Sequence, residues 1–340
     1  MSETKLKTEP AMMDKQERSK TRKTIVVHDP LPTRKELLEL DLRKLKSDSQ
    51  KAKNHLEFHQ KKIATYKKLE KRLKSVIEDK DGALNTHKPP HQKTSGFREW
   101  TEQNVNLCTG CLNDCIYCYA KALAYRRKQV EPGHWQEQII RQKEVDAPRK
   151  LYSGRVGFPS THDINDSNIE ACLTVLGKLL RAGNEVLIVS KPRLECIKRI
   201  CSVSEFFKNE IMFRFTIGAT DDNILTFWEP GAPAYAERKE ALKYAYDQGF
   251  QTSVSVEPML DSPNIDFLIN DLIPYTSDSI WIGTMNHLGN LKKQGDENIK
   301  NAVSTIEANQ SPEILIEIYN RFRNNDKIKW KSSIKKIVGL

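Results

Sequence analysis

Short apolar runs alternate with amphipathic segments over most of the chain from residue 103 onward. Six of these runs are rich in β-branched and aromatic residues and have the length of buried strands; they cover 103–107, 154–158, 185–190, 211–218, 251–257 and 279–283. The segments between them carry apolar residues at helical spacing, most clearly from Ile169 to Leu180. This alternation predicts an α/β fold with a parallel sheet and right-handed crossovers. The sheet is either open and doubly wound or curved into a full or partial barrel, and periodicity does not choose between them.

The first hundred residues follow a different pattern. Residues 1–33 are polar, rich in lysine and interrupted by prolines, so we expect a disordered basic tail. Residues 34–85 are rich in Leu, Glu, Lys and Arg, with apolar positions such as Ile63, Tyr66 and Leu73 at helical spacing. They predict a long helix or a helical hairpin. Because its apolar stripe is thin, four arrangements stay open for this extension. It packs on the body, forms a coiled coil, lies along a partner, or stays a solvated helix.

Charge and composition narrow the class of protein. The net charge of +10 lies entirely in residues 1–100, which hold 25 Lys and Arg against 15 Asp and Glu. A basic extension is compatible with nucleic-acid binding, although it is also typical of an ordinary solvated surface. No apolar run is long enough to span a bilayer or to serve as a signal peptide, so we expect a cytoplasmic protein with no membrane partner.

Four of the seven cysteines fall within the eleven residues 108–118, directly after the first expected strand. Loops at the carboxyl ends of parallel strands are where active sites form in α/β folds. Cys111, Cys115 and Cys118 are separated by three and then two residues, and thiolates at this spacing can reach three corners of an iron-sulfur cube. The fourth iron would then lack a protein ligand and could bind a substrate.

Two other interpretations of this loop stay open at this point. With Cys108 included, four thiolates could hold a structural zinc, although zinc sites usually place a longer span between their ligand pairs. The cysteines could also be inert core residues. Cys172, Cys196 and Cys201 lie on expected helical faces and are interpreted as core.

The cysteine spacing, with Tyr117 before the last cysteine, resembles the signature of the radical S-adenosylmethionine superfamily. Residues 97–120, 156–163, 215–242 and 254–261 are similar to the branch that contains spore photoproduct lyase. The resemblance implies a partial (βα)6 barrel over 97–285, and residues 286–340 would form a helical segment packed on it. It also implies a [4Fe-4S] cluster that reductively cleaves S-adenosylmethionine to a 5′-deoxyadenosyl radical, and an electron donor such as flavodoxin or ferredoxin.

The same resemblance assigns roles to residues outside the cysteine triplet. Positions at successive strand ends would contact the cofactor, and two tyrosines beside the last cysteine would lie near it and pass hydrogen atoms. The cofactor positions are Thr161, Asp163, Lys191 and Thr216, and the tyrosines are Tyr117 and Tyr119.

Two further features bear on the site and its substrate. Glu257 joins the expected site because a carboxylate that ends a buried strand needs a partner. The lyase carries a hydrogen-donating cysteine where this chain has Ser160-Thr161-His162, so repair of DNA dimers is not implied. His162 is a candidate proton donor or an ordinary hydrogen-bonding residue.

The sequence therefore predicts a radical enzyme with a lyase-like or other hydrogen-abstracting reaction. The alternative from a different class is a non-catalytic, zinc-binding module that binds nucleic acid through its basic extension.

Overall fold

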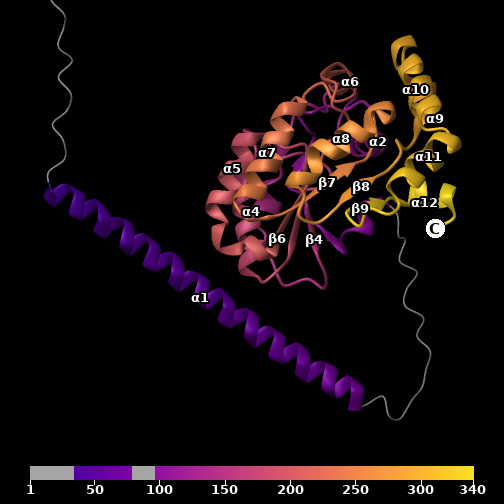
Figure 1. Ribbon diagram of the computed structural model, residues 1–340. Coiled ribbons are helices and arrows are strands. Elements are labelled where there is room, and N and C mark those ends of the chain that lie inside the picture. The colour runs from indigo at the N-terminus through magenta and orange to yellow at the C-terminus, as the bar shows by residue number, and fades with distance from the viewer. Residues whose placement is uncertain (1–33, 79–95) are drawn as a thin grey trace, which may run out of the picture. The chain divides into compact units, whose positions relative to one another are not determined.

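The computed structural model describes residues 34–78 and 96–340 (Figure 1). The expected disordered tail at 1–33 and the linker before residue 96 lie outside the described residues. The described residues divide into two units, one that ends at Asn54 and one that begins at His55 and runs to Leu340. No helix in the described ranges is both long enough and apolar enough to cross a membrane.

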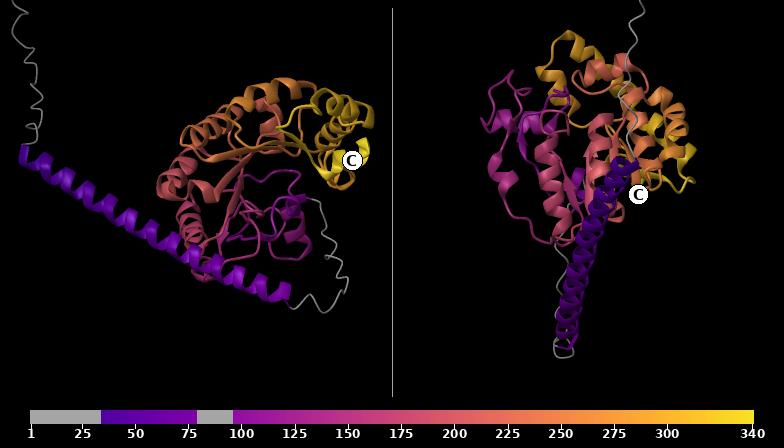
Figure 2. Two further views of the ribbon diagram at one scale, coloured as in Figure 1. Left: turned by 60° about the horizontal axis from the view of Figure 1, so that its bottom comes forward. Right: turned by 90° about the vertical axis from the view of Figure 1, so that its left-hand side faces the viewer.

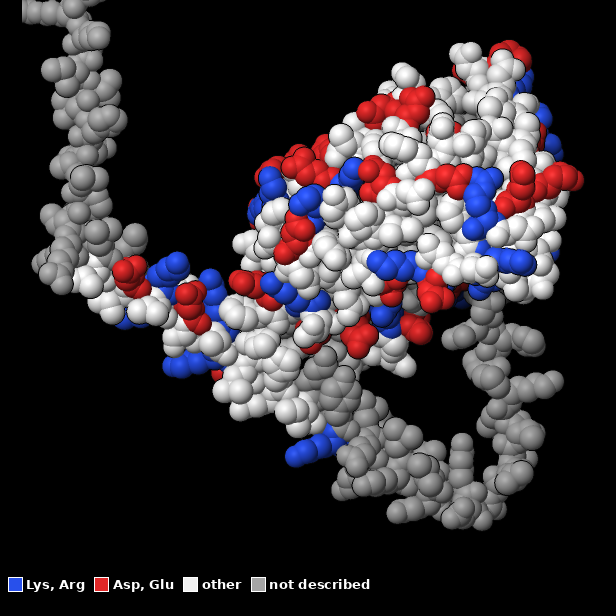
Figure 3. All heavy atoms as spheres, viewed as in Figure 1, with Lys and Arg blue, Asp and Glu red and all other residues white. Residues whose placement is uncertain are grey.

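Helix α1 (Arg34–Glu78) is a single helix of 45 residues, which is the first of the two forms expected for this segment. It contains no proline or glycine, so nothing in its sequence interrupts the backbone hydrogen bonds. Acidic and basic side chains follow one another along it (Figure 3), and its large apolar side chains include several that are exposed. Its composition favours a helix. Within the second unit the helix also contacts the body: Phe58 is buried with its ring centre 4.8 Å from that of Phe207, and His55 Nε2 lies 2.7 Å from the Phe206 carbonyl oxygen. Packing on the body, one of the arrangements expected for this extension, is thus present at these residues.

The body is built on one parallel sheet whose strands follow each other in chain order. All six strands expected from the apolar runs are present, and a seventh, β9, continues the sheet beyond them. In order of position the strands are β1 (Gln103–Asn104), β4 (Val156–Phe158), β5 (Val186–Ser190), β6 (Ile211–Thr216), β7 (Gln251–Val256), β8 (Ile280–Ile282) and β9 (Ile328–Trp330). Sequential order with parallel pairing confirms the α/β fold and is that of a partial barrel.

Helices cover the outer side of the curved sheet, and the colours pass in sequence from magenta to yellow around it (Figure 2). The principal crossover helices are α4 (Ile169–Arg181), α5 (Leu194–Val203), α7 (Tyr235–Asp247) and α8 (Ile265–Leu272). Shorter helices are α2 (Tyr119–Arg126), α3 (Gln142–Asp146) and α6 (Asp222–Trp228), with 3₁₀ turns at Gly96–Glu99, Glu205–Glu210, Ser262–Asn264 and Ile273–Tyr275. The carboxyl-terminal segment adds α9 (Leu288–Gln294), α10 (Glu297–Asn309), α11 (Pro312–Phe322) and α12 (Ser332–Val338) around β9.

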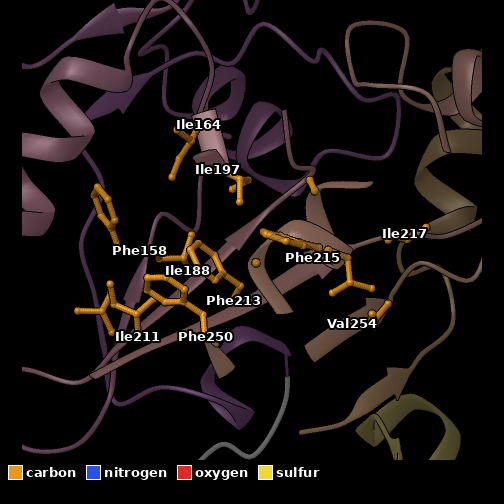
Figure 4. Packing of buried hydrophobic residues seen from close by; sticks show 14 of the residues in the cluster. Phe158, Ile164, Ile188, Ile197, Ile211, Phe213, Phe215, Ile217, Phe250 and Val254 are labelled. Atoms are coloured by element: carbon orange, nitrogen blue, oxygen red, sulfur yellow. The ribbon is translucent and has the colours of Figure 1, made fainter. Parts of the chain in front are cut away.

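The main core lies between the sheet and these helices. Strands β5 and β6 are buried almost throughout, which is typical of parallel strands covered on their faces. Phe213 on β6 packs against Phe215 and Phe250, with ring centres 5.3 and 5.4 Å away (Figure 4). Cys172, Cys196 and Cys201 are buried on α4 and α5, where the helical pattern placed them. This rigid core fixes the positions of the strand ends, from which the site is built.

Candidate active site at the carboxyl ends of the strands

The cysteine loop, residues 110–118, leaves a small antiparallel pair formed by β2 (Cys108–Thr109) and β3 (Ile139–Ile140). Gly110 has a φ of +86°, and a Cβ atom there would lie 2.7 Å from the carbonyl oxygen of Trp135. The Cys111 N–H donates to that same oxygen at 2.9 Å. Glycine is required for this close turn, which brings the chain over Trp135 as the loop begins.

Three of the four clustered cysteines face one cavity of about 520 Å³. Cys111, Cys115 and Cys118 line it, whereas Cys108 is not among its lining residues and belongs to the main core. The Cys108 thiol accepts a hydrogen bond from Gln138 Nε2 at 3.3 Å, and burial raises its pKa to about 11. The structure therefore separates Cys108 from the triplet.

The three cavity thiols are suited to binding a metal. Burial, followed by the charge of Asp163, raises the pKa of Cys111 to about 12, and burial also raises the pKa values of Cys115 and Cys118. Without a metal they are protonated, and a metal must displace those protons to bind. Two backbone N–H groups already point at the sulfurs: Asp163 N lies 3.4 Å from Cys111 Sγ, and Lys121 N lies 3.4 Å from Cys118 Sγ. Such donors stabilise thiolates in iron-sulfur proteins, so the donor set fits a cluster.

The geometry fits a single metal ion less well. Over residues 34–78 and 96–340, no three His, Cys, Asp or Glu side chains are arranged as the ligands of one ion. A cluster binds each thiolate at a different iron, so its protein ligands do not need to converge on one point.

Asp163 ties the cysteine loop to the neighbouring strand β5. Its Oδ1 accepts from Ser190 Oγ at 2.9 Å and from the Lys191 N–H at 2.8 Å, and its Oδ2 accepts from Asn113 Nδ2 at 2.8 Å. Burial by itself would raise the pKa of Asp163, but the charge of Lys191 and these hydrogen bonds lower it. The carboxylate is thus ionised and fully engaged, so it positions its neighbours.

Lys191 lies between two carboxylates. Its Nζ is 3.9 Å from Asp163 Oδ2, 3.9 Å from Glu229 Oε1, and 5.6 Å from the centre of the Tyr117 ring. Burial works to lower the pKa of Lys191, but the ionisable groups around it raise that pKa well above its usual value. A positive charge is therefore fixed beside the cysteine loop.

Glu229, which the sequence did not single out, holds the other side of this arrangement. Its side chain is fully buried, accepts a hydrogen bond from the Tyr117 hydroxyl, and lies 2.5 Å from Nη1 of the fully buried Arg238. Burial and then the charge of Glu229 raise the pKa of Tyr117 well above its usual value, so the phenol stays protonated. The Arg238 Nε also donates to the Pro233 carbonyl at 2.7 Å.

The segment around Glu229 also contacts the cysteine loop through backbone hydrogen bonds. Ile116 N donates to the Trp228 carbonyl at 2.9 Å, and Gly231 N donates to the Asn113 carbonyl at 3.0 Å. A Cβ atom on Gly231 would collide with the carbonyl oxygen of Leu112. These contacts hold the loop in place against the segment around Glu229.

Tyr119 has a different environment from Tyr117. It is 51% exposed, lines the cavity, and donates its hydroxyl to the Ser160 carbonyl at 2.6 Å. The turn at Ser160 and Thr161 is fixed by Asn106, whose Oδ1 accepts from both backbone N–H groups at 2.7 and 2.9 Å. The turn after β4 is therefore rigid where it borders the cavity.

His162 faces the cavity as a neutral ring. The Leu107 N–H donates to its Nε2 at 3.2 Å, and burial lowers its pKa to about 4. With Nε2 acting as acceptor, this ring serves as a hydrogen-bonding residue of the turn, the second of the two roles expected for it.

Glu257, at the end of β7, has the partner that its position required. Lys331 Nζ, which follows β9, lies 3.2 Å from Glu257 Oε2 and 3.1 Å from Glu99 Oε1. It also lies 3.8 Å from the centre of the Trp100 ring, and its side chain is 1% exposed. Burial raises the pKa of Glu257 and the charge of Lys331 opposes that shift. The residue that follows the seventh strand, which was not expected, thus supplies the partner of Glu257.

All the site residues expected from the sequence line this one cavity. They are Cys111, Cys115, Cys118, Tyr117, Tyr119, Thr161, Asp163, Lys191, Thr216 and Glu257. Sequence reasoning missed Asn113, Glu229, Arg238 and Lys331. Glu229 and Arg238 lie within residues 215–242, which resemble the lyase branch, but nothing local showed that they would meet beside the cysteine loop.

Comparisons with known proteins return distant likenesses. No family model matches the chain. An uncharacterised protein of Methanocaldococcus jannaschii is 22% identical over 181 residues, which cover 51% of this chain and 66% of that protein, just under two thirds of it.

Two solved structures align with the fold. Spore photoproduct lyase complexed with dinucleoside spore photoproduct is 13% identical with a TM-score of 0.46, over 71% of this chain and 80% of that one. SuiB of Streptococcus suis bound to the precursor peptide SuiA is 10% identical with a TM-score of 0.44, over 80% of this chain and 63% of that one.

Proposed function

We propose that this protein is a radical S-adenosylmethionine enzyme. Cys111, Cys115 and Cys118 would ligate three irons of a [4Fe-4S] cluster and leave the fourth iron open to the cofactor. When bound, the cluster would supply one electron to the sulfonium of S-adenosylmethionine and so generate a radical that abstracts hydrogen from a substrate. An external reductant such as flavodoxin or ferredoxin would supply that electron.

One observation carries this proposal. Three thiols from a single short loop face a common cavity at the carboxyl edge of the parallel sheet, while the neighbouring Cys108 is packed in the core. The cavity volume of about 520 Å³ lies within the range of small-molecule sites. A three-thiolate cluster with room beside it requires this division of the cysteines.

The other residues of the cavity would bind and orient the cofactor. Thr161 and Lys191 lie at the strand ends next to the cysteines. The carboxylate and amino groups of the methionine part of S-adenosylmethionine would there meet the Thr161 hydroxyl and the fixed positive charge of Lys191. Asp163 acts on them indirectly, because both of its oxygens are already occupied by protein donors. Thr216 and Glu257 supply further polar groups along the same wall for the ribose hydroxyls.

The two tyrosines would play unequal parts in passing hydrogen atoms. The Tyr117 hydroxyl donates its hydrogen bond to the buried Glu229, so this residue is suited to holding the cysteine loop as well as to passing a hydrogen atom. Tyr119 is half exposed at the cavity and is better placed to exchange a hydrogen atom with a ligand there. Its loss should impair turnover more than cluster binding.

The zinc-binding alternative finds no support in the geometry. It needs four thiolates around one ion, and the structure places Cys108 in the core with its sulfur hydrogen-bonded to Gln138. Binding of nucleic acid by the basic extension stays a separate prediction.

Anaerobic reconstitution with iron and sulfide tests the proposal. The protein should take up about four irons per chain, become EPR-active on reduction with dithionite, and release 5′-deoxyadenosine from S-adenosylmethionine. Cys→Ala variants at 111, 115 and 118 should lose the iron, whereas Cys108→Ala and Cys172→Ala are matched controls that should keep it. A triple variant that retained iron and cleavage would overturn the ligand assignment. A loaded wild-type protein that released no 5′-deoxyadenosine would contradict the activity while leaving the cluster in place.

A further inference from the structure

Helix α1 exposes a row of large apolar side chains between residues 38 and 63. Each is more than half exposed: Leu38 55%, Leu42 55%, Leu45 65%, Leu56 59% and Ile63 54%. A long helix in water is stabilised mainly by packing its apolar face, so leaving this row exposed would forfeit the largest contribution available to it. The row therefore indicates a surface that packs against a partner.

The spacing of the row identifies the kind of partner. Steps of four and three residues connect positions 38, 42, 45, 49, 52, 56, 59 and 63, which repeats every seven residues. Six of these eight positions are apolar, and only Ser49 and His59 are polar. Apolar residues at alternating steps of four and three keep one seam facing a second helix along a left-handed supercoil. The seam spans 26 residues, or about 39 Å at 1.5 Å per residue.

The charges beside the seam select a second copy of the same helix. Asp41 and Asp48 lie on one flank of the seam, Lys46 and Lys53 lie on the other, and all four are exposed. In a parallel pair in register, each aspartate faces the lysine five residues further along in the other copy, which gives two Asp–Lys pairs on each side. An antiparallel pair would instead bring Lys46 of one copy near Lys53 of the other. Charge complementarity thus favours the parallel arrangement.

We propose that α1 is a dimerisation helix, in which residues 38–63 form a parallel, in-register coiled coil with the same residues of a second copy of this chain. The small or polar residues Ser49 and Ala52 form two weak layers in the middle of the seam. The adjacent Asp48–Lys53 pair lies beside those layers and fixes the register there. This inference is independent of the proposed chemistry, because no residue of α1 lines the cavity.

The first test compares the mass of the full-length protein with that of two helix variants, by size-exclusion chromatography with light scattering. The wild-type protein should be a dimer that dissociates on dilution. Leu42→Glu with Leu45→Glu places charges in the seam and should give a monomer at every concentration. Gln50→Glu with Asn54→Glu is the matched control, because it adds the same charges on the exposed outer side of the helix and should leave the dimer intact. Circular dichroism checks that the body stays folded in each variant.

A charge-swap experiment tests orientation and register. Lys46→Glu with Lys53→Glu and, separately, Asp41→Lys with Asp48→Lys should each weaken self-association, because like charges then face each other. Mixing the two variants, one of them carrying a larger tag, should restore a one-to-one heterodimer at low salt. A wild-type monomer at all concentrations would overturn the proposal. A dimer that survives the Leu42 and Leu45 substitutions, or a mixture that does not form heterodimers, would do the same.

Discussion

Replacing Glu229 by glutamine should destabilise the protein far more than an ordinary charge substitution. Glu229 and Arg238 are both fully buried and lie 2.5 Å apart, and Lys191 approaches Glu229 to 3.9 Å. Together with Asp163, these residues form a buried group of two positive and two negative charges. Glu229→Gln removes one negative charge and leaves the group with a net charge of +1, with the Arg238 side chain still fully buried.

The expected magnitude follows from that uncompensated charge. Breaking a buried ion pair from one side typically costs about 3–5 kcal/mol, because the remaining charge keeps its desolvation penalty without its partner. Replacing both members is expected to cost less than the sum of the two single changes. The double variant Glu229→Gln, Arg238→Met should therefore recover part of the loss and show a large coupling energy.

Equilibrium urea unfolding of the full-length protein, without metal, measures these free energies. The pair Lys292–Glu307 is a matched control, because its atoms are 2.7 Å apart but its side chains are 45% and 41% exposed. Glu307→Gln should change the free energy of unfolding by no more than about 1 kcal/mol. If Glu229→Gln were as mild as Glu307→Gln and showed no coupling to Arg238, the argument from buried charge would be refuted.

Three further outcomes are expected. Gly231→Ala should lower the free energy of unfolding by about 1–3 kcal/mol and reduce iron uptake, because its new methyl group collides with the Leu112 carbonyl. Gly289→Ala, where a methyl group meets open space, should change neither quantity. His162 binds its proton more weakly when folded, so the free energy of unfolding should fall by up to about 3 kcal/mol as the pH drops from 6.5 toward 4. In urea titrations His162→Gln should abolish that part of the pH dependence. An unchanged pH profile in the variant would contradict the assignment to His162. Deletion of residues 1–85 should leave the release of 5′-deoxyadenosine intact while removing salt-sensitive binding of polyanions. A truncated protein that folds but releases no 5′-deoxyadenosine would instead show that the extension contributes to the site.

The sequence predicted the elements well because their signals are local. The run that became β5 is apolar up to its last residue, and those that became β6 and β7 are rich in aromatic and β-branched residues although they include Arg214 and two serines. A strand buried on both faces favours such a composition whatever surrounds it. β9 was missed because its Ile and Trp alternate with lysines over residues 327–331, so no apolar run marks the strand. Its place in the sheet depends on pairing with β8, which no local signal shows.

The candidate site, like the fold, has features that the sequence predicted and features that only the tertiary structure shows. The spacing within residues 111–118 determined which cysteines could reach a common ligand, and the strand ends determined which polar residues would join them. Only the tertiary structure decided that Cys108 turns into the core and that Glu229 meets Arg238 behind Tyr117. It alone brought Lys331 to Glu257, across 74 residues of sequence.

The physical reason lies in the range over which each interaction acts. Backbone geometry sets the periods of strands and helices within a few residues, and the proposed metal loop is defined by the spacing of its thiols, so the sequence alone predicted those features. A buried charge must instead find a partner wherever the packed chain supplies one, and the order and curvature of the sheet decide which residue that is.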